Sequence, residues 1–163
     1  MSSTISLRLA LAIAGLMIGG CSSSVSTKTI VGEYQVMITY LNVSDPDTLS
    51  IKPGTNGSVL LTFAAGITTD ADGPNPDGLR ATLDSSTQFK LAPQPAHVDH
   101  STGNLTGSMS GEGTVAIDGT VMGTLHFTPM NGAVRDADGG LVPVPDGGSN
   151  VVLDYQLTGS RLQ

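Results

Sequence analysis

The sequence predicts an all-β fold, either an antiparallel β-sandwich or a small up-and-down barrel of about 8–10 short strands with two long acidic loops. Three observations support this prediction. Apolar and polar residues alternate with a period of two along much of the chain, and no helical period is visible. Gly, Ser, Thr and Val are abundant, whereas the aromatic residues are three Tyr, three Phe and no Trp.

The predicted strands begin with residues 33–41 and continue at 49–51, after a turn at Ser44-Asp-Pro-Asp47. Further strands are expected at 58–64, 79–83 and 88–92. In the predicted strands 33–41 and 58–64, the alternate apolar residues share one face and predict a core. They are Tyr34, Val36, Ile38 and Tyr40 in the former and Val59, Leu61 and Phe63 in the latter.

A hairpin over residues 113–127 is the strongest local signal, because Asp118-Gly119 separates two alternating runs. This dipeptide is typical of a two-residue type I′ turn, in which both central residues take a positive φ. We expect Ile117 and Thr120 to flank the turn, and Leu125 and Phe127 to face the core.

The last predicted strand, residues 151–157, places Val151, Leu153, Tyr155 and Leu157 on one face. Two irregular stretches, 68–78 and 129–150, interrupt the strands. Stretches longer than about 12–15 residues are usually functional or mobile.

Both irregular stretches contain Asp-Ala-Asp-Gly followed by Pro-Asp-Gly. Closely spaced carboxylates suit Ca²⁺, but Pro74 and Gly140 occupy the fifth position and no Glu follows at the twelfth, unlike an EF-hand. Ordinary Asx turns account for the same residues. The candidate calcium ligands are Asp70, Asp72, Asp77, Asp136, Asp138 and Asp146.

A zinc site is a second metal hypothesis, because His97, Asp99 and His100 are close in sequence and His126 supplies a further imidazole. An extended backbone would point His97 and Asp99 one way and His100 the other. Pro93 and Pro95 predict a loop just upstream, where a bend could bring the side chains together. A solvated loop is the alternative.

The chain opens with a basic start, Met1 to Arg8, and continues with an uncharged apolar run over residues 9–18. This pattern is that of a secretory signal peptide. The run is shorter than the about 20 apolar residues that a spanning helix needs.

The apolar run ends in Ile18-Gly19-Gly20-Cys21, which resembles the lipobox of bacterial lipoproteins. The resemblance implies cleavage after Gly20, a diacylglyceryl group on the Cys21 thiol and an acylated new amine. Cys21 is the only cysteine, so an intrachain disulfide cannot form. Ser22 follows it where an aspartate would resemble the inner-membrane retention signal, so the resemblance implies sorting to the outer membrane.

We therefore expect a signal peptide over residues 1–20, a lipidated flexible tether over 21–29 and a single β domain over 30–163. The protein would be exported and lipid-anchored, facing the periplasm or the cell surface. Its formal charge of −7 becomes −8 once Arg8 is removed, which argues against nucleic acid as a partner.

The expected function is that of a non-catalytic envelope lipoprotein that binds or scaffolds an unknown envelope protein or a small ligand. A lipocalin-like carrier and a calcium-dependent binding module remain as alternatives, although Tyr34 stands where lipocalins have the Trp of Gly-x-Trp. No enzyme and no cofactor is expected, because Gly107-Ser-Met-Ser-Gly111 has Met109 where a nucleophile elbow needs its nucleophile.

Overall fold

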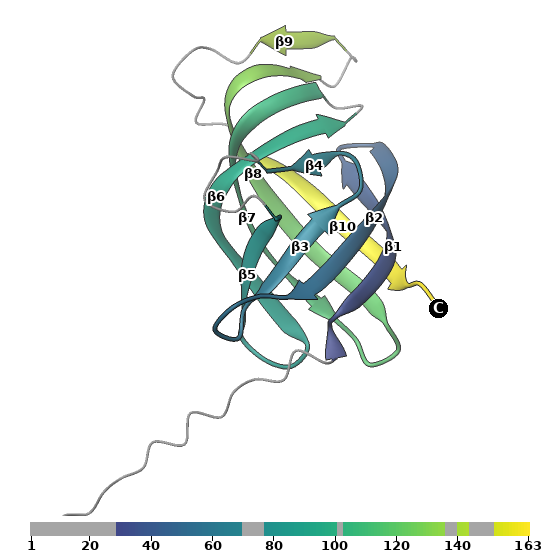
Figure 1. The fold of residues 1–163 in the computed structure, drawn as a ribbon. Helices are drawn as coiled ribbons and strands as arrows, with labels where there is room; N and C mark the ends of the chain where they lie inside the picture. The colour runs from purple at the N-terminus through teal and green to yellow at the C-terminus, as the bar shows by residue number, and fades with distance from the viewer. Residues whose placement is uncertain (1–28, 70–76, 101–102, 136–139, 144–151) are drawn as a thin grey trace, which may run out of the picture.

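The computed structural model describes residues 29–69, 77–100, 103–135, 140–143 and 152–163, and its strands form one antiparallel sheet (Figure 1). The sheet closes into an eight-stranded barrel, because β10 pairs with both β1 and β8. The barrel strands are β1 (Gly32–Tyr40), β2 (Val43–Pro53), β3 (Val59–Phe63), β5 (Leu79–Leu83), β6 (Gln88–His100), β7 (Gly103–Val115), β8 (Thr120–Arg135) and β10 (Leu153–Arg161).

Each barrel strand pairs antiparallel with its neighbour in sequence, so the topology is up-and-down. Of the two expected architectures the barrel is therefore right and the sandwich is wrong. Sequence alternation alone cannot separate them, since both bury one face of every strand; the difference lies in the pairing of the last strand with the first.

The barrel interior holds the apolar residues that the alternation predicted. Val36, Ile38, Val59, Leu61 and Phe63 are buried, as are Leu125, Phe127 and the residues of the last strand that face inward. An eight-stranded barrel is just wide enough for side chains to fill. The polar residues that alternate with them along each strand, mostly Thr, Ser and Gln, cover the outer wall.

Strand β7 is longer than expected, since only its last residues were predicted as strand. Its inward positions include Gly107, Gly111 and Gly113, which give no apolar alternation. A Cβ at Gly113 would lie 2.3 Å from the Phe89 ring, and one at Gly111 would lie 2.3 Å from the Thr124 carbonyl oxygen. These glycines let the wall curve sharply and make room for the ring.

The predicted turn at Ser44–Asp47 is wrong, because these residues belong to β2. The chain reverses instead at Leu41 and Asn42, where Tyr40 pairs directly with Val43. Pro46 is tolerated in the strand because β3 pairs with β2 only from residue 49 onward, so no hydrogen bond from that side is lost.

Strand β6 continues through Pro93 and Pro95, where a loop was predicted. A register shift between Leu91 and Gln94 accommodates Pro93, and Pro95 pairs in register with Ser108 of β7. The buried Gln94 amide stabilises this bulge, because its oxygen accepts from the Arg80 N–H at 2.8 Å and its nitrogen donates to the Arg80 carbonyl at 2.8 Å.

The hairpin between β7 and β8 was predicted correctly, but its turn type was not. Gly119 has a φ of 87°, whereas Asp118 is not among the residues with positive φ. The Gly119 N–H donates to the Ala116 carbonyl at 2.9 Å and the Thr120 N–H donates to Asp118 Oδ1 at 2.8 Å. The loop is thus a three-residue type I turn followed by a left-handed glycine.

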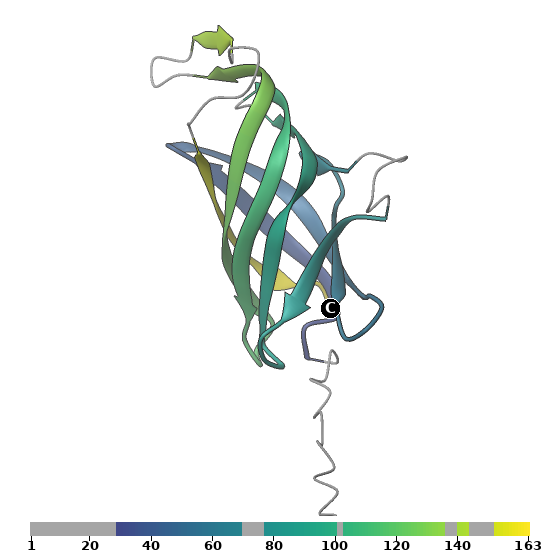
Figure 2. The same ribbon diagram turned by 90° about the vertical axis from the view of Figure 1, so that its left-hand side faces the viewer.

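Strands β6, β7 and β8 extend beyond the barrel body, and β9 (Leu141–Pro143) pairs with the tip of β8 (Figure 2). The expectation of uniformly short strands is therefore wrong. The first irregular stretch, 68–78, begins at the last residue of β4 (Ile67–Thr68), which pairs with β6. The second, 129–150, contains the last part of β8 together with β9. We call this end of the barrel the far end.

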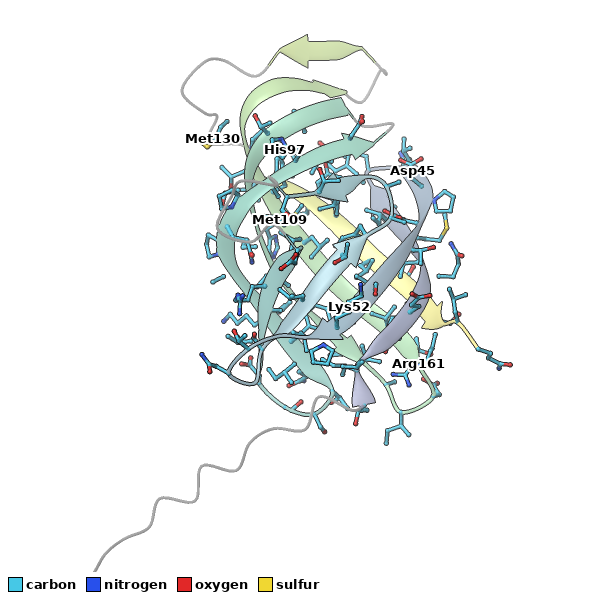
Figure 3. The ribbon with its side chains drawn as sticks, viewed as in Figure 1. Asp45, Lys52, His97, Met109, Met130 and Arg161 are labelled. Atoms are coloured by element: carbon cyan, nitrogen blue, oxygen red, sulfur yellow. The ribbon has the colours of Figure 1, made fainter. Side chains whose placement is uncertain are left out.

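The opposite end, called here the terminal end, is where the chain enters and leaves the barrel (Figure 3). Arg161 links the entering and the leaving segments of the chain. Its guanidinium donates hydrogen bonds to the Thr29 carbonyl and, at 2.7 Å, to the Tyr34 hydroxyl. The guanidinium also lies 5.3 Å from the Tyr34 ring centroid. The Tyr34 hydroxyl donates to the carbonyl of the buried Ile30 at 2.7 Å. The buried Ile30 is thus held against Tyr34 at this end of the barrel.

Candidate functional site

A hollow of about 440 Å³ lies on the outer wall and is lined by strands β6, β7, β8 and β10 and the hairpin between β5 and β6. We call it the outer groove. Its floor includes Gly113 and Gly123, which pair directly across β7 and β8. Its volume lies within the range of about 300–1,000 Å³ that is typical of small-molecule sites.

Outward side chains from four strands and one hairpin form the rim of the outer groove. They supply two carboxylates, two amides, three threonine hydroxyls and one thioether, and they are Asp84, Glu112, Gln88, Gln156, Thr114, Thr124, Thr158 and Met122. Period-two alternation places them outside because their neighbours in sequence face the core. Strand register, rather than sequence distance, brings them together.

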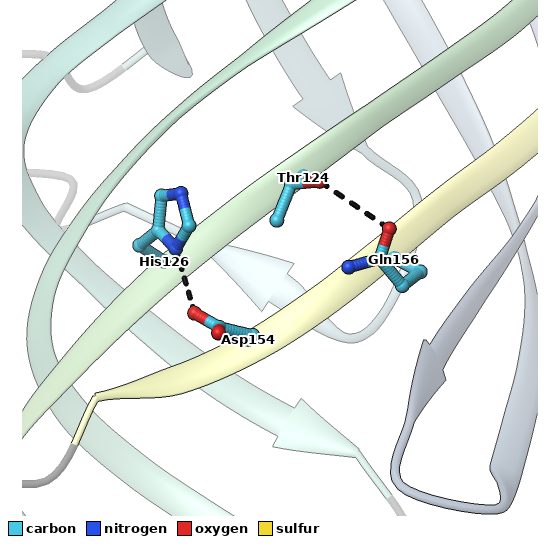
Figure 4. Close-up of polar contacts among 4 residues, drawn as sticks. All are labelled: Thr124, His126, Asp154 and Gln156. Carbon is cyan, nitrogen blue, oxygen red and sulfur yellow. Dashed lines mark hydrogen bonds and ion pairs between the residues drawn. The ribbon is translucent and has the colours of Figure 1, made fainter.

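Strands β8 and β10 carry a ladder of polar pairs along the groove (Figure 4). Thr124 Oγ1 donates to Gln156 Oε1 at 3.3 Å. One step towards the far end, His126 Nδ1 and Asp154 Oδ1 are 2.6 Å apart, with side chains 44% and 60% exposed. An ion pair this exposed contributes about 0–1 kcal/mol to stability, so its main effect is to orient the imidazole.

Tyr40 lies next to this ladder, and its ring centroid is 5.3 Å from that of Tyr155. Partial burial raises the pKa of the Tyr40 phenol, and the nearby Asp154 carboxylate raises it further. The phenol is therefore neutral at ordinary pH and available as a hydrogen-bond donor.

The second hollow, of about 200 Å³, lies where β3 and β5 diverge above their three paired positions. Buried Leu61, Phe63 and Ile67 line it, with Thr62 and Asp77 at its rim. Asp77 contributes a backbone carbonyl that accepts from Thr62 Oγ1 at 3.0 Å. This hollow is smaller than the usual small-molecule site.

Most of the predicted site residues lie outside the described residues. These are Gly20, Cys21, Asp70, Asp72, Asp136, Asp138 and Asp146, and only exposed Asp77 of the calcium candidates is described. Within the described ranges, no three His, Cys, Asp or Glu residues form a group suited to a metal ion. Isothermal titration with CaCl₂ remains the test of the calcium hypothesis.

The described residues of the zinc hypothesis do not converge. His97 on β6 lies opposite Thr106 of β7, whereas His126 on β8 lies opposite Ser110. Those two positions are four steps apart along β7, which is about 13 Å. The predicted loop that would have bent this segment is part of β6, and the His100 side chain lies outside the described residues.

No family model matches the chain, and neither the curated proteins nor the solved structures contain a match. In the part of the chain that the structure describes, no helix has the length and hydropathy of a membrane span.

The sequence prediction did not single out the residues of the outer groove. Asp84, Glu112 and Gln156 are far apart in the chain, and each looks like an ordinary outward residue of its strand or hairpin. One feature of the groove is visible in the sequence: Gly113 and Gly123 lie at equal distances on either side of the predicted hairpin turn.

Proposed function

We propose that the protein is a lipid-anchored, non-catalytic envelope protein that binds a partner or ligand through the outer wall of its barrel. The lipobox at Ile18–Cys21 supports the anchor, because a basic start, an apolar run of suitable length and the cysteine motif coincide. Two or three acyl chains, at about 0.8 kcal/mol per buried methylene, make such an anchor stable.

The observation that supports an outer binding surface is the contrast between interior and exterior. Inward positions are occupied by large buried side chains, among them Tyr34, Phe89, Met109, Phe127 and Tyr155. The outer groove lies on the outside of the barrel and has a mixed polar rim. A carrier would need the reverse arrangement, with an apolar cavity inside the barrel, so the carrier alternative is less well supported.

Orientation on a membrane would follow from the terminal end. The first described residue, Thr29, is tied to Arg161, so residues 22–28 are the chain between the lipid-bearing cysteine and the barrel. Seven extended residues span at most about 25 Å. The anchor would hold the terminal end close to the bilayer and leave the outer wall accessible from the side.

Detergent-phase partition of the expressed protein tests the anchor. Wild-type protein should enter the detergent phase and incorporate a labelled fatty acid, whereas Cys21→Ser should do neither. Ser22→Ala is the matched control and should behave as wild type. Recovery of unlabelled wild-type protein in the aqueous phase would contradict the proposal.

Chemical crosslinking in intact cells tests the binding role. The anchored protein should recover a specific envelope component that the Cys21→Ser chain does not recover at the same level. Recovery of background proteins alone would count against a protein partner and would leave small ligands to the experiment described below.

A further inference from the structure

The rim of the outer groove restricts the chemistry of what can bind there. The described residues that line it include no Lys or Arg. Lys90, which pairs with Glu112 across β6 and β7, is outnumbered by the two carboxylates of Asp84 and Glu112. An anion such as phosphate or sulfate would meet net negative charge at this site. A purely apolar ligand would leave the polar rim groups desolvated without partners.

Two classes of ligand remain, cations such as polyamines and neutral molecules rich in hydroxyl groups. The amides distinguish them. Gln156 Oε1 accepts from Thr124 Oγ1 and keeps one further lone pair, while the NH₂ group of the same amide has two N–H donors that need acceptors. An ammonium group has donors only and cannot accept from the amide N–H groups, whereas a hydroxyl both donates and accepts and so complements both ends of the amide.

Hydroxyl groups match the rest of the rim as well. The carboxylates of Asp84 and Glu112 accept hydrogen bonds, the Gln88 and Gln156 amides donate them, and the threonine hydroxyls do both. Met122, 55% exposed, gives the rim a flexible apolar contact suited to C–H groups.

We propose that the outer groove is a binding site for a neutral, polyhydroxylated ligand, a carbohydrate. This inference deepens the proposed binding role and rests on it. Phe89 also lines the groove but is only 1% exposed, so it offers no open ring face for stacking and a single site binds weakly. Many anchored copies on one surface bind a polymeric glycan through multivalency. Free oligosaccharides and polymeric glycans share the recognised chemistry.

Ligand-observed saturation-transfer NMR on the full lipidated chain in nanodiscs tests the proposal. The probes are three neutral trisaccharides (maltotriose, cellotriose and N,N′,N″-triacetylchitotriose), with spermine and inorganic phosphate as comparators. At least one trisaccharide should receive saturation, and the comparators should not. Retention on an insoluble glycan then distinguishes a polymeric ligand from a free one.

Two variants locate the site. Glu112→Ala should lower trisaccharide affinity at least about tenfold, because it removes a charged acceptor. Gln156→Glu keeps the acceptor for Thr124 but replaces the amide donor with a third carboxylate; it should weaken the trisaccharide and strengthen spermine. Glu33→Ala and Gln163→Glu are the matched exposed controls outside the groove and should leave binding unchanged.

Absence of saturation transfer from every trisaccharide would overturn the proposal, as would binding of spermine alone or binding that the groove variants do not alter. A melting curve equal to that of wild type establishes that each variant is folded. Repeating the NMR experiment with the Cys21→Ser chain separates this test from the anchor, because the groove should bind whether or not the lipid is present.

Discussion

The seam between β10 and β1, which distinguishes the barrel from a sandwich, contains a glycine whose substitution tests the closure directly. Gly159 lies opposite Val36. A Cβ at this position would lie 2.2 Å from the Gln35 carbonyl oxygen and 2.8 Å from the Val36 Cα, both of them backbone atoms. Gly159→Ala must therefore push the two strands apart.

The expected cost follows from the kind of atoms involved. Overpacking a filled core costs about 1–3 kcal/mol when side chains can adjust. Backbone atoms held by two ladders cannot, so we expect Gly159→Ala to cost about 3 kcal/mol, a large part of the about 5–15 kcal/mol by which a domain is stable. The loss should appear as a lower urea midpoint with an unchanged slope.

Gly57→Ala is the matched control. Its added Cβ meets nothing within 4 Å, and its φ of 74° leaves only the left-handed penalty of roughly 1–2 kcal/mol. The assay is equilibrium urea unfolding followed by circular dichroism. If Gly159→Ala costs no more than Gly57→Ala, the strands β1 and β10 are not packed as described and the barrel is not closed there.

Three further predictions concern the wall and its turns. Leu41→Gly should raise the melting temperature, because an exposed Leu with a φ of 52° carries a left-handed penalty of about 1–2 kcal/mol. The extra backbone entropy that glycine loses on folding costs only about 0.5–1 kcal/mol, so the net change stabilises the protein. A lower melting temperature would refute this. Because the Tyr40 pKa is raised in the folded state, the contribution of Tyr40 to stability is full below about pH 10 and is lost as pH rises through the folded pKa. Tyr40→Phe should therefore flatten the fall in urea midpoint at alkaline pH. An equal fall in both proteins would count against the raised pKa. A double-mutant cycle on His126→Ala and Asp154→Ala should give a coupling below about 1 kcal/mol at neutral pH, and a coupling of several kcal/mol would mean that the pair is desolvated.

The sequence predicted those parts of the fold in which one face of a strand is apolar. β1, β3 and β10 have inward residues such as Val36, Leu61 and Leu157, so their alternation is visible without any partner. The hairpin at Asp118-Gly119 was visible for the same reason, although the Thr120 N–H bond to Asp118 selects a turn type that the dipeptide alone does not specify.

The missed parts have specific physical causes. β7 was missed over most of its length because glycine replaces apolar residues at Gly107, Gly111 and Gly113, where the wall curves too sharply for a Cβ. The last part of β6 was missed because Pro93 and Pro95 normally interrupt a strand. In the structure the buried Gln94 amide, bonded to Arg80, helps to hold the bulge within the sheet.

The outer groove could not be predicted from the sequence, because its chemistry depends on register across four strands. Shifting β10 by one residue against β8 would turn Gln156 towards the core and Leu157 to the surface. The pairing of Thr124 with Gln156, and of His126 with Asp154, is a property of the closed sheet rather than of any local motif.

Mass spectrometry of the N-terminal peptide of the mature protein tests the account most directly. The account predicts a chain that begins at Cys21, with a diacylglyceryl group on the sulfur and an acyl group on the new amine, and loss of both in Cys21→Ser. A mature chain that begins elsewhere, or a Cys21 with an unmodified thiol, would contradict the lipid anchor and would leave the barrel without its proposed attachment to the membrane.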